Sequence, residues 1–177
     1  MSLLGGSNLI NSEIQKLLNN LISVENLSSS LYLAMSAYMA TKNYTGMSHW
    51  LRLQAEEERT HMLKLIDYVT DRGGTVEILN VPTQQATFGT PLETFSKVLE
   101  HEKYVTKTYR DSYDYANQID QQTAILLQDF LREQVDEEAQ AQKIVDRLTL
   151  AQNNASAILL LDQELGNRTG GTAPAGG

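Results

Sequence analysis

The chain of 177 residues contains no cysteine. This absence excludes a disulfide framework, cysteine nucleophiles, thiolate-bound zinc and iron–sulfur clusters, but it leaves open metal sites built from oxygen and imidazole ligands. Proline is almost as scarce, because only Pro82, Pro91 and Pro174 are present. The stretches 1–81 and 92–173 are therefore free of the strongest helix breaker, and long helices can form in both.

Long hydrophobic runs and positive charge are also lacking. No apolar run approaches the roughly 20 residues that span a bilayer, and the first six residues lack the basic and apolar regions of a signal peptide. The formal net charge of −8 disfavours nucleic acid or an anionic membrane as a partner and is compatible with attraction of cations. We expect a soluble, cytoplasmic protein of one domain, with no nucleic-acid or membrane partner.

Four long helices are predicted by apolar residues that recur at steps of three and four. They cover about 11–40, 47–72, 92–116 and 122–152. The connection of about 17 residues between the second and third helices can extend roughly 55 Å, whereas a helix of 27 residues is roughly 40 Å long. We therefore predict an all-α four-helix bundle with the order up-down, long crossover, up-down.

The ends of the chain are expected to differ from the bundle. The leucine-rich segment Ala155–Leu165 is too short for a bundle member, so it predicts an appended fifth helix whose apolar face needs another surface, such as that of another subunit. Residues 1–10 are interpreted as an N-terminal extension and 11–165 as the ordered domain. The small residues of 166–177 predict a disordered tail.

Each predicted bundle helix carries an apolar stripe that polar residues interrupt near the middle of the helix. The interrupting residues are Glu25, Glu58 with His61, Glu102, and Gln134 with Glu137. Midpoints of bundle helices lie at the same depth whichever way each helix runs, so these side chains are expected to share one layer. Unpaired ionised carboxylates in an apolar interior are strongly unfavourable, so this layer needs cations among the carboxylates or protons upon them.

The spacing on the second helix favours a metal. Glu58 and His61 lie three residues apart on one helical face, so both can bind the same ion. A single Glu-x-x-His string is weak, but carboxylates at the same depth on three other helices strengthen it. Oxygen ligands with one imidazole suit iron or manganese, and a shared carboxylate commonly holds a metal pair. The alternative is a core of protonated, hydrogen-bonded glutamates without metal.

With these residues placed, the chain resembles the ferritin family, and specifically the bacterial non-haem ferritins, over about residues 10–165. The resemblance implies a di-iron ferroxidase centre inside each subunit. Glu25, Glu58 and His61 would bind the first iron, with Glu58 as the bridging ligand. The second-iron region would be formed by Glu102, Gln134 and Glu137.

Further residues follow from the same resemblance. Tyr32, one heptad after Glu25, matches a tyrosine near the centre, although an ordinary core tyrosine explains it equally well. A third iron site would use Glu57, Glu133, Asp136 and Glu137, although acidic runs are more often solvated helix faces.

Departures from related subfamilies argue against haem. Bacterioferritins carry a second Glu-x-x-His where this chain has Gln134 and Glu137, and their haem-ligating methionine is replaced here by Arg59. We interpret Met35 and Met62 as core residues. His49 and His101 are interpreted as surface or structural residues.

The resemblance implies iron storage. Fe(II) would be oxidised by dioxygen or hydrogen peroxide, and Fe(III) mineral would collect inside a homo-oligomeric shell of 24 subunits, with the fifth helix at the four-fold contact. An acidic ring for a three-fold channel is not evident, because the fourth helix begins with Thr123, Ala124 and Leu127, and the nearest acids are Asp120 and Asp129.

Two alternatives remain open. One is a di-iron or di-manganese oxidase or peroxidase without a storage role, which commonly has two Glu-x-x-His motifs. The other is a non-catalytic structural bundle.

Overall fold

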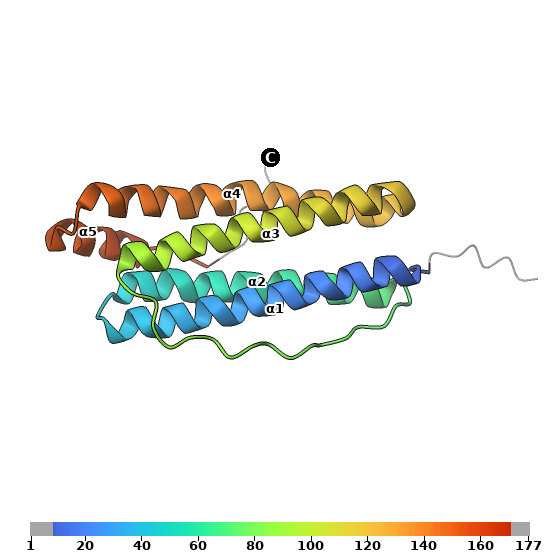
Figure 1. The fold of residues 1–177 in the computed structure, drawn as a ribbon, viewed down its shortest axis with the longest axis horizontal. Helices are drawn as coiled ribbons and strands as arrows, with labels where there is room; N and C mark the ends of the chain where they lie inside the picture. Colours follow the sequence, from blue (N-terminus) through green and yellow to red (C-terminus); the bar gives the residue numbers. More distant parts are fainter. Residues whose placement is uncertain (1–8, 171–177) are drawn as a thin grey trace, which may run out of the picture.

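Five α-helices form the fold in residues 9–170, which the computed structural model describes (Figure 1). They are α1 (Ser12–Thr41), α2 (Thr45–Asp71), α3 (Pro91–Ile119), α4 (Gln121–Ala151) and α5 (Ala155–Leu165). No strand occurs in this part of the chain, and none of its helices is long and apolar enough to cross a membrane. The predicted all-α bundle with a short fifth helix is confirmed.

The connections set the direction of each helix. Short turns at 42–44 and at Asp120 make α1 antiparallel to α2 and α3 antiparallel to α4, and these two pairs pack most extensively. The segment 72–90 runs along the whole bundle, so α2 and α3 are parallel (Figure 1). The predicted long crossover is therefore confirmed.

Four helices begin where a side-chain oxygen accepts a backbone N–H of the first turn. Asn11 accepts from Glu13 and Ile14, and Thr90 forms a capping box with Glu93. The remaining two caps are Asp120 for α4 and Asn154 for α5. Such caps satisfy amide groups that have no partner within the helix.

The fifth helix supplies the cap that α2 lacks. Tyr44 at the start of α2 makes no side-chain cap, but the Asp162 carboxylate accepts from the amides of Met47 at 2.8 Å and Gly46 at 3.2 Å. A negative charge at a helix N-terminus is favourable. A Cβ atom on residue 46 would lie 1.7 Å from the Asp162 carbonyl oxygen, so the close approach of α5 requires glycine there.

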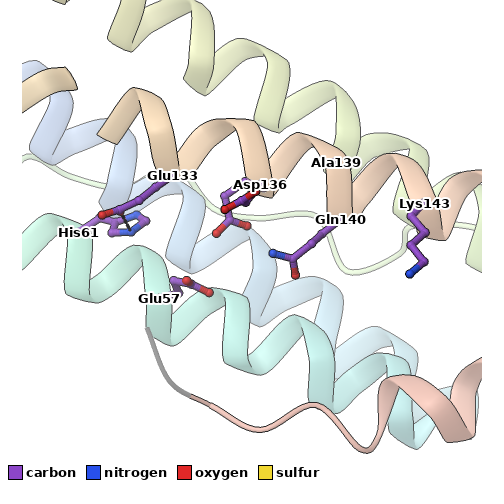
Figure 2. A pocket seen from close by; sticks show the side chains of 8 residues that line it. Glu57, His61, Glu133, Asp136, Ala139, Gln140 and Lys143 are labelled. Atoms are coloured by element: carbon purple, nitrogen blue, oxygen red, sulfur yellow. Dashed lines mark ion pairs between the residues drawn. The ribbon is translucent and has the colours of Figure 1, made fainter. Parts of the chain in front are cut away.

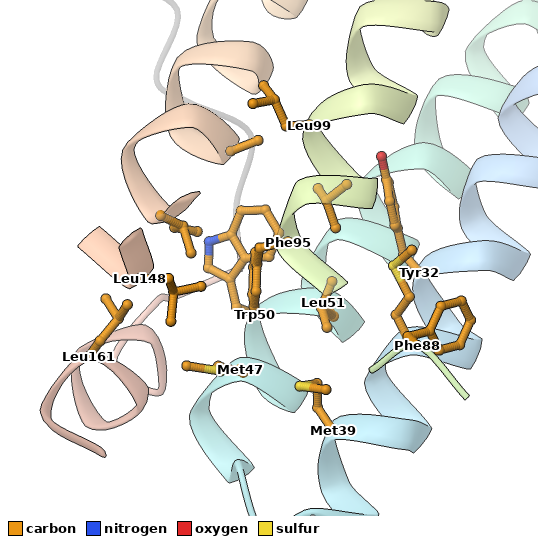
Figure 3. Packing of buried hydrophobic residues seen from close by; sticks show 14 of the residues in the cluster. Tyr32, Met39, Met47, Trp50, Leu51, Phe88, Phe95, Leu99, Leu148 and Leu161 are labelled. Atoms are coloured by element: carbon orange, nitrogen blue, oxygen red, sulfur yellow. The ribbon is translucent and has the colours of Figure 1, made fainter. Parts of the chain in front are cut away.

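Two apolar clusters fill the bundle on either side of the polar layer. One includes Met47, Trp50, Phe95 and Leu148 and extends to Leu161 of α5 (Figure 3). The other holds the opposite ends of the same four helices, including Leu18, Leu65, Val105 and Leu127. Each helix changes from one cluster to the other at its polar interruption, so the apolar packing holds the interrupting residues in the middle of the bundle.

Residues 166–170 lie against α2. The Arg168 guanidinium donates to Gln54 Oε1 at 2.5 Å and Glu57 Oε2 at 2.9 Å, and it stacks on the Trp50 ring. The predicted disorder from residue 166 onward did not anticipate this contact, because glycine-rich composition carries no signal for a single anchoring arginine. The rest of the predicted tail, 171–177, and residues 1–8 of the predicted extension lie outside the described residues.

We expect Asp162→Ala to lower the free energy of unfolding by about 1–2 kcal/mol, the usual effect of removing an N-cap carboxylate. Chemical denaturation followed by circular dichroism, at fixed protein concentration, measures the change. Gln163→Ala, at the exposed neighbouring position, is the matched control. An equal loss in both variants would contradict the capping role.

Candidate metal centre

The six residues predicted to share a layer are all buried. Their exposed fractions are 0% for Glu25, 1% for Glu58, 7% for His61, 1% for Glu102, 2% for Gln134 and 4% for Glu137. They come from α1, α2, α3 and α4, and on each helix the polar residues lie on the same buried face as the apolar core residues. An interior with four carboxyl groups and one imidazole is unusual enough to need a chemical explanation.

Three of the six form a compact group of possible ligands. One atom each of Glu25, Glu58 and His61 lies within 4.8 Å of the other two, and His61 Nδ1 lies 3.1 Å from Glu58 Oε2. Glu25 Oε2 is the one buried side-chain oxygen or nitrogen in residues 9–170 that has no hydrogen-bond partner. An unpartnered buried carboxylate oxygen beside a carboxylate and an imidazole fits a divalent cation.

The other three residues are held by hydrogen bonds rather than gathered into that group. Gln134 Nε2 donates to Glu102 Oε2 at 3.0 Å, and Gln54 Nε2 donates to Glu137 Oε2 at 2.6 Å. Sequence reasoning gave no role to Gln54. Its position one turn before Glu58, on the same stripe, was the available signal.

Burial raises the pKa of all four inward carboxyl groups. For Glu25 and Glu58 the pKa lies well above its ordinary value, first because of burial and then because of repulsion from Glu58 and Glu102 respectively. Burial also raises the pKa of Glu102. For Glu137, burial together with the charges of Glu57 and Glu102 raises the pKa to about 8. Without a cation, the centre therefore retains protons near neutral pH.

His61 is fixed between two carboxylates. Its Nδ1 faces Glu58, and its Nε2 lies 2.9 Å from Glu133 Oε2. Burial lowers the pKa of His61, but the hydrogen bond and charge of Glu133 and the charge of Glu25 outweigh burial, so the pKa is raised overall. A carboxylate on one ring nitrogen orients the other toward a metal. Glu133 therefore has a contact that the sequence did not predict.

The residues predicted for a third site line one pocket. Figure 2 shows this pocket between α2 and α4; its volume is about 320 Å³, and Glu57, Glu133, Asp136 and Glu137 are among its lining residues. Two of these acids already face cationic groups: Glu57 contacts Arg168 at 2.9 Å, and Glu133 lies 3.5 Å from Lys64 Nζ. The structure thus brings the four into one groove but not into a compact ligand group.

Tyr32 is buried beside the centre. Its hydroxyl donates to Glu102 Oε1, and its ring meets His101 edge-on at 5.6 Å between centroids. His101 also lies 2.8 Å from Ser28 Oγ, and burial lowers its pKa to about 4, so it is a neutral structural residue. The Tyr32 hydroxyl thus contacts a predicted ligand, and its role at the centre stays a prediction.

The remaining singled-out residues lie away from the layer. Arg59 and His49 are exposed, and His49 Nε2 contacts the Arg168 carbonyl oxygen at 2.8 Å. Asp120 and Asp129 are paired with Arg72 and Arg132. The prediction that haem is absent rests on Arg59 and stays a prediction.

Comparison with known proteins shows which family this chain belongs to. A model of the ferritin-like domain matches residues 15–151. The chain belongs to the ferritin family. The family resemblance noted from the sequence is thereby confirmed, and the match spans all four helices that supply the buried polar residues.

Individual relatives cover nearly the whole chain. A bacterial non-heme ferritin of Bacteroides fragilis is 38% identical over 161 residues, which are 90% of this chain and 100% of that protein. One of Staphylococcus aureus is 33% identical over 91% of this chain and 98% of its own length. The open-pore ferritin of Archaeoglobus fulgidus superposes with a TM-score of 0.89 at 38% identity, covering 90% of this chain and 98% of its own.

We expect cation binding by this ferritin-family chain to release protons and to weaken as the pH falls. The raised pKa values mean that the folded protein binds these protons more tightly than the unfolded chain does, and a cation must displace them. Between about pH 8, the pKa of Glu137, and pH 6, the affinity for Zn²⁺ should fall steadily. Calorimetric titration in buffers of different ionisation enthalpy counts the released protons, and a pH-independent affinity without proton release would contradict this assignment.

Proposed function

We propose that the protein stores iron and that each subunit oxidises Fe(II) at a di-iron centre inside its bundle. The observation that carries this proposal is the compact group of Glu25, Glu58 and His61 with its unpartnered carboxylate oxygen. Membership of the ferritin family supports the same function, and the relatives are named bacterial non-heme ferritins.

Each inward residue has a role in this proposal. Glu25 and His61 bind the first iron, Glu58 bridges both, and Glu102, Gln134 and Glu137 form the second-iron region. Two Fe(II) ions lose one electron each, and one dioxygen takes these two electrons and two protons to become hydrogen peroxide. With peroxide as the oxidant, the same two electrons and two protons yield two waters.

The groove between α2 and α4 is proposed as the outlet from the centre. Its acids Glu57, Glu133, Asp136 and Glu137 surround a pocket open to solvent, and carboxylate oxygens suit iron in either oxidation state. A third iron would have to compete with Arg168 for Glu57 and with Lys64 for Glu133.

The storage part of the proposal needs an enclosed shell, for which we propose 24 copies of this chain in the cytoplasm. The apolar surface near the chain's C-terminal end supports association, because Leu150, Leu159 and Leu160 are 80%, 50% and 57% exposed. Exposed large apolar side chains favour contact with another subunit.

Solution mass before and after aerobic Fe(II) loading tests the proposed function directly. We expect a large assembly that takes up many irons per subunit without dissociating. Light scattering gives the mass, and iron analysis gives the ratio. A small oligomer that retains two irons would instead favour an oxidase or peroxidase without storage, and no uptake would leave a structural bundle.

Substitution of the bridging residue should impair oxidation most. Glu58→Ala is expected to slow the initial absorbance change on Fe(II) addition by more than about 100-fold, because even residues that only support metal ligands contribute 10–100-fold. His61→Ala should be impaired less, because it serves one metal. Asp67→Ala, at an exposed position of the same helix, should behave as the unsubstituted protein, and unaltered binding in both site variants would refute the assigned centre.

Tyr32→Phe separates iron binding from the later reaction. We expect the affinity for the first cation to change by less than about tenfold, since the phenol contacts Glu102 rather than the compact group. The decay of the first oxidised species should change, as measured by stopped-flow absorbance. Complete loss of Fe(II) binding would show that this role for Tyr32 is wrong.

A further inference from the structure

The spacing between Glu25 and Tyr32 on α1 occurs a second time on α3. Glu102 and Tyr109 are also seven residues apart, which is two turns and places both side chains on one face. Helices α1 and α3 contact each other and run in opposite directions (Figure 1). Each helix therefore presents a glutamate and, two turns later, a tyrosine to the other.

The two tyrosines make reciprocal hydrogen bonds. Tyr32 of α1 donates to Oε1 of Glu102 on α3, and Tyr109 of α3 donates to Oε1 of Glu25 on α1. Their exposed fractions are 0% and 1%. The resemblance to ferritins drew attention only to Tyr32, although the second pair has the same spacing and the same geometry.

Packing fixes the position of the Tyr109 phenol. Its ring stacks on Phe130 of α4 with centroids 4.9 Å apart and planes at 18°. Phe130 in turn meets the His61 ring edge-on at 5.5 Å, and Lys64 Nζ lies 4.6 Å from the Phe130 centroid. Residues of α4 and α2 therefore hold the ring of Tyr109 in place.

The two oxygens of Glu25 are consequently not equivalent. Oε1 accepts the hydrogen bond of Tyr109, whereas Oε2 accepts no hydrogen bond from any of residues 9–170. We propose that Tyr109 is a positioning residue of the metal centre that occupies Oε1 of Glu25 and presents Oε2 alone to the cation.

This proposal rests on cation binding at the centre, as proposed above, and adds the way in which Glu25 binds. With Tyr109 in place, Glu25 is a ligand through one oxygen. Without the hydroxyl, the carboxylate is free to rotate and to bind through both oxygens, which changes the coordination number. Residues that orient a metal ligand typically contribute 10–100-fold to metal affinity.

Tyr109→Phe in the full-length protein tests the proposal, because it removes the hydroxyl and keeps the ring on Phe130. We expect the affinity for the first Zn²⁺ to fall by about 10–100-fold. With Co²⁺ as the probe, the visible d–d absorption should change in position and intensity, because it reports coordination number. Tyr113→Phe is the matched control: Tyr113 lies one turn further along α3 and contacts Gln128 at 3.3 Å, so its variant should match the unsubstituted protein.

A double-mutant cycle shows whether Tyr109 acts through Glu25. In a Glu25→Gln background, Tyr109→Phe should cause no further loss of Zn²⁺ affinity, because the ligand that the phenol orients is already altered. An undiminished further loss would overturn the proposal. So would an unchanged affinity and Co²⁺ spectrum in Tyr109→Phe, or a loss that Tyr113→Phe shares.

The unsubstituted protein separates this proposal from the proposed function. If it binds neither Zn²⁺ nor Co²⁺, the metal centre itself is wrong, and the positioning role falls with it. If it binds both ions and Tyr109→Phe binds them identically, only the positioning role is wrong. Retention of the thermal midpoint in Tyr109→Phe is expected, and a large decrease with an unchanged Co²⁺ spectrum would indicate a purely structural residue and overturn the proposal.

Discussion

Repulsion among buried carboxyl groups is the constraint on which this structure depends. Glu25, Glu58, Glu102 and Glu137 are all less than 5% exposed, and the apolar surroundings cannot stabilise four negative charges. Protons relieve the repulsion in the metal-free protein, as the raised pKa values show. A pair of divalent cations would relieve it more completely, because each cation replaces protons and also attracts the charges that remain.

The rest of the bundle keeps this unfavourable layer in place. Apolar clusters pack on both sides of it along the bundle, while donors such as Tyr32, Gln54 and Gln134 each satisfy one carboxylate oxygen. The exception is Glu25 Oε2. Within residues 9–170, every other buried side-chain oxygen or nitrogen has a hydrogen-bond partner. One unpartnered carboxylate oxygen next to Glu58 and His61 is what a cation-binding site is expected to show.

Periodicity predicted the helices and their inward faces, because these depend on which residues of one helix share a face. The length of the connection predicted the crossover, and the midpoints of the helices predicted the depth of the polar layer. Contacts between helices were not predictable in this way. The hydrogen bond of Tyr109 to Glu25, the contact of Glu133 with His61 and the anchoring of Arg168 on Glu57 each join segments far apart in sequence. The contact of Tyr109 with Glu25 could have been inferred from the sequence, because Glu102 and Tyr109 repeat the seven-residue spacing of Glu25 and Tyr32. The contact of Arg168 could not, because a single arginine in a glycine-rich segment forms no pattern.

The two ends of α2 are fastened to different parts of the molecule. Asp162 of α5 binds its first amides, and Arg72, directly after its last residue, pairs with Asp120 before α4 at 2.9 Å. A helix that moved along its axis by one residue would displace its side chains by about 1.5 Å. These two contacts therefore oppose movement of α2 along its axis and so keep Glu58 and His61 at a fixed depth in the bundle. A displacement of α5 would therefore be passed to Glu58 and His61 through a single helix.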